Sequence, residues 1–194
     1  NQMVFPGLDL MKFIVYWVKF EAVFMDSVPL SRKLNKYCQC IGMTDLLSVN
    51  THYRLDDLIR ILGKSKYPSL NTFHLSKENR PTIEVRIAED AFCKEPVHVL
   101  NWIRLILHFF ESVKNRPCES ITNYIPRDRW SGLAWLDVRD LFEVLGFLRD
   151  DISDGLKETR NWFLHRLNAN CIYPDVPGVF SENGRAISRK QIQE

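Results

Sequence analysis

The sequence predicts an α+β protein that is mostly helical and carries a small antiparallel sheet. Several long stretches repeat apolar side chains at the spacing of a helix, which indicates that helices dominate. Two short stretches, residues 70–75 and 82–88, have the composition of strands. The polar residues 76–81 between them are typical of a turn, so we expect the two strands to pair as an antiparallel hairpin.

Two helices are predicted before the hairpin. Residues 8–26 place aromatic side chains at helical spacing, and Pro29 cannot continue the helix. Residues 54–62 show a second apolar face, and Gly63 suits the position that follows the last helical residue. The aromatic side chains of the first helix are expected to form core: Phe13, Trp17, Phe20 and Phe24.

Three more helices are predicted after the hairpin. Residues 96–113 are apolar nearly all round, so this helix is expected to be central. Residues 137–145 form the next predicted helix, which Gly146 ends. Residues 153–167 form the last one, with an apolar stripe along one face.

The length of 194 residues suits one domain with its own core. We expect residues 1–172 to form this domain and residues 173–194, which are rich in Pro and Gly, to form an extended C-terminal arm. The chain starts at Asn1 without an initiator Met, which indicates either a fragment of a longer protein or a start that was removed.

Composition argues against several classes of partner. The net charge of +2 gives no field that would attract nucleic acid or an acidic membrane. The most apolar stretch, residues 8–28, is interrupted by charged residues, which favours a buried helix over a membrane span. The five cysteines include a single close pair, Cys38 and Cys40, whereas a zinc site usually shows a second pair. This spacing argues against a zinc site and favours reduced thiols in the cytoplasm.

The second predicted strand alternates polar and aliphatic side chains. Thr82, Glu84 and Arg86 are two residues apart and would share one face. A carboxylate on such a face can hold a divalent cation, and a guanidinium can bind a phosphate or a carboxylate through two hydrogen bonds. A solvated outer face with an ordinary Glu84–Arg86 pair is the simpler alternative, and spacing alone does not decide between the two.

A series of short motifs resembles a known family in its order and spacing. The motifs are Ser31-Arg32, Asn35-Lys36-Tyr37-Cys38, Leu70-Asn71, Thr82-Ile83-Glu84-Val85-Arg86 and Asn101-Trp102-Ile103-Arg104. Over residues 8–113 the chain resembles the second half of the amidoligase family, which belongs to the glutamine-synthetase-like carboxylate–amine ligases. The first half of that family, with a Gly-x-Glu-x-Glu strand and a Gly-x-His-x-His strand, has no counterpart in this chain.

The resemblance implies a glutamine-synthetase/glutamate-cysteine-ligase-like catalytic half-domain that uses ATP and magnesium. In such an enzyme ATP phosphorylates a carboxylate, and an amine attacks the acyl phosphate to give an amide. Glu84 would then be a magnesium ligand, and Arg86 would bind the γ-phosphate or the substrate carboxylate. Arg32 would give a second phosphate contact, and Asn71 would hold the phosphate or fix the neighbouring strand. The remaining ligands would come from an N-terminal half.

Other interpretations remain open at this point. Arg32 could be a solvated loop residue, and Asn71 could bond its own turn at the end of a strand. The chain could be a non-catalytic relative that serves as a scaffold or subunit of a larger protein assembly. Binding of nucleic acid is the weakest alternative, because the aromatic and basic residues that would support it sit in a chain of balanced charge: Arg116, Arg127, Arg129 and Trp130.

Overall fold

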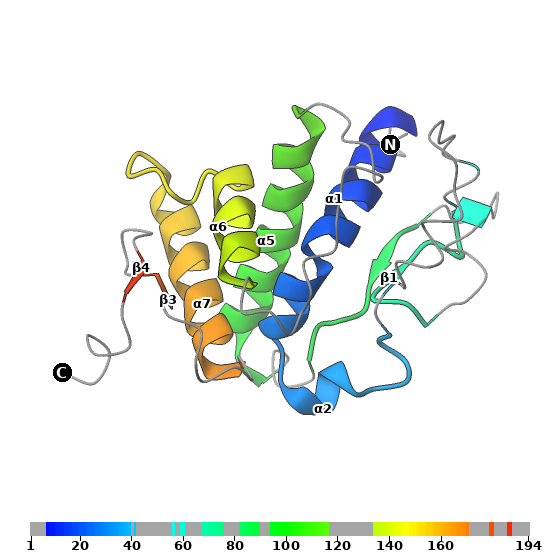
Figure 1. Ribbon diagram of the computed structural model, residues 1–194, viewed down its shortest axis with the longest axis horizontal. Coiled ribbons are helices and arrows are strands. Elements are labelled where there is room, and N and C mark those ends of the chain that lie inside the picture. The colour runs from blue at the N-terminus through cyan, green and yellow to red at the C-terminus, as the bar shows by residue number, and fades with distance from the viewer. Residues whose placement is uncertain are drawn as a thin grey trace. The chain divides into compact units, whose positions relative to one another are not determined.

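The computed structural model is mostly helical and carries small antiparallel pairs of strands, so the predicted α+β class is confirmed (Figure 1). It describes residues 7–39, 41, 56, 59–60, 67–75, 82–89, 94–116, 134–170, 179–180 and 186–187. Its elements are α1 (Gly7–Asp26), α2 (Leu30–Lys33), β1 (Leu70–Asn71), β2 (Glu84–Val85), α5 (Pro96–Lys114), α6 (Ala134–Val144), α7 (Asp154–Asn170), β3 (Val179–Phe180) and β4 (Ala186–Ile187).

The chain divides into two compact units. Unit 1 comprises Asn1–Glu21, Ser31–Ile87 and Val113–Pro126, and unit 2 comprises Ala22–Leu30, Ala88–Ser112 and Arg127–Glu194. Helix α1 therefore contributes its first turns to unit 1 and its last turn to unit 2. A single domain over residues 1–172 stays a prediction.

Unit 1 combines the first part of α1 with the strands β1 and β2. The predicted helix over residues 8–26 is present, and its aromatic side chains are buried as expected, with Trp17 at 0% exposure. Leu70 pairs with Val85 and Asn71 with Glu84 in an antiparallel register. Of the helix predicted for residues 54–62, only residues 56, 59 and 60 are described, and they are helical.

The strands are shorter than residues 70–75 and 82–88. The Leu75 amide donates to the Thr72 carbonyl at 2.9 Å, which closes a turn over residues 73–75 directly after β1. A local turn takes the place of further hydrogen bonds between the two strands. Composition alone does not distinguish such a turn from the end of a strand. The aliphatic face still forms core, because Leu70 and Ile87 have no exposed surface.

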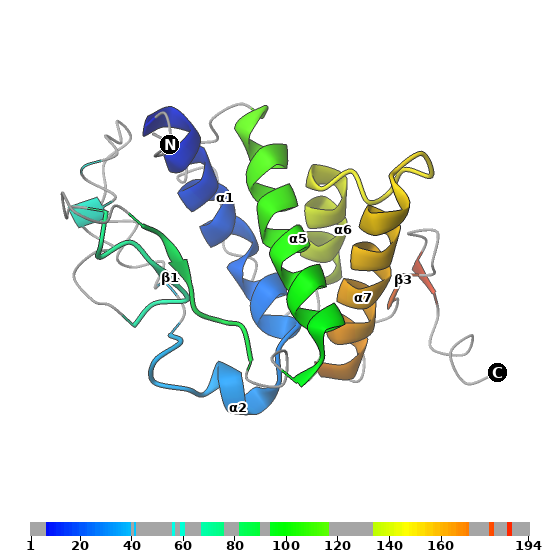
Figure 2. The same ribbon diagram turned by 180° about the vertical axis from the view of Figure 1, so that it is seen from behind.

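Unit 2 is built on helices α5, α6 and α7, which lie side by side in both views (Figure 1, Figure 2). Its core is a cluster of phenylalanine rings. Phe24 meets Phe109 edge to face with centroids 5.2 Å apart, and Phe142 stacks on Phe163 at 6.0 Å. Offset and edge-to-face arrangements of this kind add to the free energy gained by burying the rings.

Gly146 ends α6 as predicted, through a Schellman motif. Its φ of +66° is a conformation that side chains with a Cβ rarely adopt. The Phe147 amide bonds the Phe142 carbonyl at 2.8 Å, and the Gly146 amide bonds the Glu143 carbonyl at 3.1 Å. The rings of Phe142 and Phe147 pack edge to face across the motif. The last carbonyl groups of α6 are thus satisfied within a few residues of the helix.

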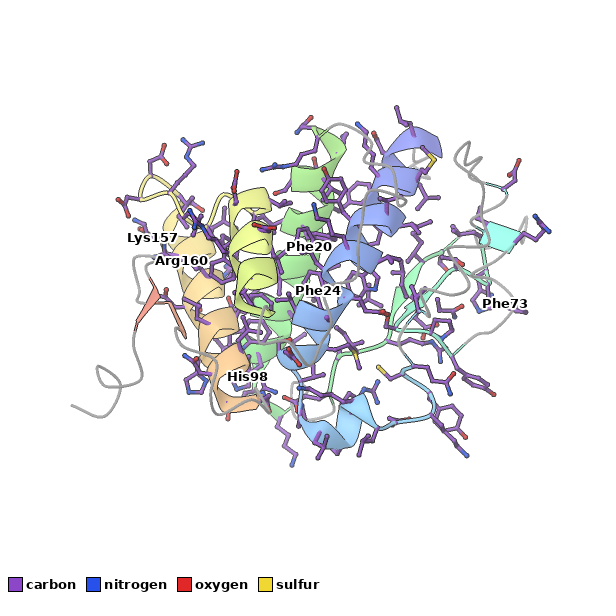
Figure 3. All side chains as sticks on the ribbon, in the orientation of Figure 1. Phe20, Phe24, Phe73, His98, Lys157 and Arg160 are labelled. Carbon is purple, nitrogen blue, oxygen red and sulfur yellow. The ribbon has the colours of Figure 1, made fainter. Side chains whose placement is uncertain are left out.

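Two neighbouring helices add further donors at this end of α6. His108 of α5 donates through Nε2 to the Leu145 carbonyl at 2.8 Å. Arg160 of α7, which is 6% exposed, donates to the Phe147 carbonyl at 3.1 Å. Figure 3 shows Arg160 and Lys157 at one end of α7 and His98 near the opposite end of this group of helices.

Helix α5 differs from the expectation that it would be central. One side is buried, but four apolar side chains are between 42% and 62% exposed: Val97, Leu100, Ile103 and Leu107. The sequence does not reveal this asymmetry, because the helix carries apolar residues on both sides.

The C-terminal part of the chain contains a second short pair of strands. In the arm predicted for residues 173–194, Val179 pairs with Ile187 and Phe180 with Ala186, and the rest lies outside the described residues. None of the described helices is long and apolar enough to cross a membrane.

Candidate phosphate-binding site

The residues singled out in the sequence come together at the β1–β2 hairpin of unit 1. Asn71 Nδ2 donates to Glu84 Oε2 at 2.9 Å, and Arg86 Nη2 donates to the same oxygen at 2.8 Å. Arg32 Nη2 reaches the Arg86 carbonyl oxygen at 2.5 Å from α2. Four residues that are up to 54 positions apart in sequence therefore form one hydrogen-bonded group, in which Arg32 bonds the backbone of Arg86.

Local structure explains how each residue reaches the group. Asn71 and Glu84 are direct partners in the ladder, so their side chains leave the same face of the hairpin. Arg86 follows Glu84 by two residues and shares that face. Arg32 lies on the short helix α2, which begins directly after Pro29.

The Glu84 carboxylate is held in its charged form by its neighbours. Burial raises its pKa, but hydrogen bonds from Asn71 and Arg86, with the charges of Arg86 and His74, outweigh this effect. The net result is a pKa below the ordinary value of 4.5. The side chain is 49% exposed, so this carboxylate is ionised at neutral pH and open to solvent on one side.

Among the residues that the structure describes, three buried polar atoms have no hydrogen-bond partner, two of them on the arginines of this site: Arg32 Nε, Arg86 Nε and Thr72 Oγ1. An unsatisfied buried donor or acceptor costs about 1–3 kcal/mol, and such groups mark places where an ion, a water or a function completes the site. Both nitrogens are N–H donors of cationic groups. An anion with several oxygens is the ligand that would satisfy both.

The donor set consists of two guanidinium groups beside one carboxylate, which is the chemistry of an oxyanion site more than of a metal site. Magnesium in proteins is held by one or two carboxylates, with waters and substrate phosphates completing its six oxygens. Among the residues that the structure describes, no three His, Cys, Asp or Glu side chains gather as a metal site would require. Glu84 is thus a single carboxylate beside two guanidinium groups.

His74 and Arg104 are two further residues with ionisable side chains. His74 lies in the turn after β1, where its ring meets the Phe73 ring edge to face at 5.3 Å. Arg104 lies on α5 in unit 2, where Nη1 donates to Glu158 of α7 at 3.1 Å. His74 is thus one of the groups that lower the pKa of Glu84, and Arg104 has a carboxylate partner of its own.

Sequence reasoning missed Glu21 and Ser69, which lie beside the site in unit 1. Glu21 of α1 is 3% exposed, and Ser69 directly precedes β1 and is fully buried. The Ser69 hydroxyl donates to Glu21 Oε1 and accepts from Trp17 Nε1 at 3.0 Å. The available signal was a lone acidic residue in an apolar part of the helix, since Glu21 follows Phe20 and precedes Ala22 and Val23.

Comparisons with known proteins add no relative. No protein-family model, no curated protein and no solved structure matches this chain.

Proposed function

We propose that this chain carries the phosphate-binding part of an ATP- and magnesium-dependent carboxylate–amine ligase with a glutamine-synthetase/glutamate-cysteine-ligase-like fold. One observation carries the proposal, namely that Arg32, Asn71, Glu84 and Arg86 form a single hydrogen-bonded group. These are the residues that the resemblance to the amidoligase family assigns to ATP and magnesium. A structural role alone does not require two guanidinium groups with unsatisfied N–H donors beside one carboxylate.

The proposed reaction needs fixed cationic groups around a phosphoryl group. ATP, when bound with magnesium, supplies the phosphoryl group that activates the substrate carboxylate, and an amine then displaces phosphate to form the amide. Arg32 and Arg86 would donate to the anionic oxygens, and their charge would offset the negative charge that develops during transfer. Glu84 would hold the metal from the solvent-open side of its carboxylate, and Asn71 would orient it through the bond to Oε2.

The substrates and the cellular setting follow from the same proposal. We propose a small-molecule or peptide carboxylate and an amine as substrates, with an N-terminal half supplying the other catalytic elements. A cytoplasmic location agrees with the need for ATP and with the buried thiol of Cys38.

The first experiment is to measure ADP release by the full-length protein, including the proposed N-terminal half, with ATP, magnesium and pooled carboxylates and amines. Glu84→Gln removes the charge that a metal needs and nearly preserves shape, so substrate-dependent release is expected to be lost. Glu111→Gln, an exposed site on α5, is the matched control and is expected to keep full activity. Full turnover by the Glu84 variant would overturn the proposal.

A non-catalytic scaffold is the second candidate function. The observation that favours it is the pairing of Glu84 with Arg86, together with the lack of a three-residue metal cluster among the described residues. This role predicts no ADP release from wild type and no ATP binding by calorimetry. Nucleic-acid binding stays an untested alternative, since Arg127, Arg129 and Trp130 lie outside the described residues.

A further inference from the structure

Glu21 is a buried carboxylate that the proposed chemistry does not use. The Ile41 amide donates to both of its oxygens, at 2.8 Å to Oε1 and 3.0 Å to Oε2. The Ser69 hydroxyl donates to Oε1 as well. Burying a carboxylate is costly unless hydrogen bonds replace its water, and these donors supply the replacement. Such an arrangement fixes the groups that donate to it.

One of these groups is next to Arg86 in the hairpin. The Arg86 amide donates to the Ser69 carbonyl at 2.7 Å, directly next to the Leu70–Val85 pair of β1 and β2. This bond attaches the backbone of Arg86 to that of Ser69. Through Ser69, Glu21 fixes the strand that lies directly opposite Arg86.

The other group belongs to the segment that follows Arg32. The Gln39 amide donates to the Tyr67 carbonyl at 3.0 Å, and the Ser69 amide donates to the Gln39 carbonyl at 2.6 Å. This parallel bridge pairs Gln39 with Pro68. Glu21 holds the end of the bridge by accepting from the Ile41 amide. The segment that carries Arg32 is thereby attached to the same carboxylate.

We propose that Glu21 is a positioning residue that sets the placement of the Arg32 and Arg86 guanidinium groups relative to each other. Both residues reach their places on segments that Glu21 ties to α1, and Arg32 touches the Arg86 carbonyl at the far end of this arrangement. A shift of one segment against the other would separate the two unsatisfied Nε donors. The identity of the anion rests on the proposed function. The coupling of Glu21 to the two guanidinium groups rests on the hydrogen bonds alone.

The test is calorimetric titration of the protein with inorganic tripolyphosphate without magnesium, so that Glu84 and its metal do not enter. Glu21→Gln places an amide N–H₂ against N–H and O–H donors and should disturb both segments. The expected result is an increase of about tenfold in the dissociation constant, the effect of one lost hydrogen bond of ordinary strength. Ser69→Ala breaks the link to β1 but leaves the Ile41 bonds, and it should weaken binding in the same direction.

Trp17 provides the control and an independent signal. Trp17→Phe removes the indole donor to Ser69 and lowers stability, yet it leaves the Glu21–Ser69 bond, so the dissociation constant should stay within twofold of wild type. The Trp17 indole N–H resonance, assigned with this variant, should shift in Glu21→Gln and in Ser69→Ala, which shows that the network has been changed.

The outcomes separate the two proposals. If wild type does not bind tripolyphosphate or ATP, the proposed function fails and the positioning role fails with it. If wild type binds and both network variants bind equally well while the Trp17 resonance shifts, Glu21 is structural only and this inference alone is overturned. If Glu21→Gln does not fold, Ser69→Ala decides. Weaker binding by this variant supports the positioning role, and unchanged binding with a shifted Trp17 resonance overturns it.

Discussion

At the scale of single residues, the site depends on which donors and acceptors of its guanidinium and carboxylate groups are already paired within the chain. Glu84 accepts from Asn71 and Arg86 on one oxygen, while the Nε atoms of Arg32 and Arg86 have no acceptor. The negative charge is satisfied within the chain, and part of the positive charge is not. An added anion would therefore complete the group, in agreement with the proposed phosphate-binding role.

The lowered pKa of Glu84 predicts a contribution to stability that depends on pH. Its folded-state pKa is below the ordinary value of 4.5, so the contribution is present above that value and is lost as pH falls through the folded-state pKa. Urea unfolding of wild type and Glu84→Gln between pH 3 and 7 checks this, in steps of about half a pH unit. The stability difference should shrink at the acidic end. A difference that is constant with pH would contradict the prediction.

Arg86→Lys tests whether the geometry of the guanidinium matters beyond its charge. Lysine can keep a charge near Glu84 but lacks the planar fork of N–H donors that matches an oxyanion. Tripolyphosphate affinity should fall about tenfold, measured by calorimetry. Arg139→Lys on the exposed face of α6 makes the same change away from the site and should leave affinity unchanged. Equal affinity in the Arg86 variant would show that charge alone is sufficient.

At the scale of elements, helix ends decide much of the architecture. The Schellman motif at Gly146 reverses the chain after α6, and His108 and Arg160 then satisfy carbonyl groups at that end. The first feature is local and follows from one glycine. The other two depend on α5 and α7 being neighbours of α6.

Two glycines give a matched pair of substitutions. Gly146 has a φ of +66°, so Gly146→Ala should lower the free energy of unfolding by about 1–2 kcal/mol. Gly155 lies in the first turn of α7, where an added Cβ would be 3.7 Å from the Arg104 side chain, an ordinary contact. Gly155→Ala should therefore raise stability by about 0.5–1 kcal/mol. Chemical denaturation of both variants checks the opposite signs, and the same sign for both would refute the argument.

At the scale of the whole molecule, a few long-range polar contacts hold distant segments together within each unit. In unit 2, Arg166 of α7 pairs with Glu89, and the two side chains are 17% and 11% exposed. Arg166 Nε also donates to the Ser27 carbonyl at 3.2 Å, and Asn170 Nδ2 bonds the same oxygen at 3.1 Å. One arginine thus joins α7 to the segment after β2 and to the end of α1.

Removing this arginine should destabilise unit 2 strongly. Arg166→Ala leaves Glu89 buried without its partner, which costs about 3–5 kcal/mol for buried pairs. Urea unfolding followed by tryptophan fluorescence measures the loss. Arg139→Ala, the same change at an exposed position, should cost less than about 0.5 kcal/mol. A loss below about 1 kcal/mol for Arg166→Ala would show that the pair is not a structural link.

Sequence patterns recovered the elements better than they recovered the contacts between them. The helix over residues 8–26, the stop at Gly146 and the antiparallel pairing of β1 with β2 all follow from neighbours in sequence. The strands were predicted too long, because the turn after Thr72 has the same composition as a strand end. The burial of α5 was overestimated, because the pattern of a helix does not tell which of its apolar sides meets a neighbour.

The sequence by itself determined that Glu84 and Arg86 share one face of a strand, because side chains alternate along a strand, whereas the register that sets Asn71 opposite Glu84 came from the structure. Only the tertiary structure decided that Arg32 joins them and that Glu21 and Ser69 lie beside them. Those contacts cross 48 to 54 residues of chain, a separation over which no periodic pattern acts. They arise because a buried carboxylate and buried N–H groups must find partners wherever packing brings them.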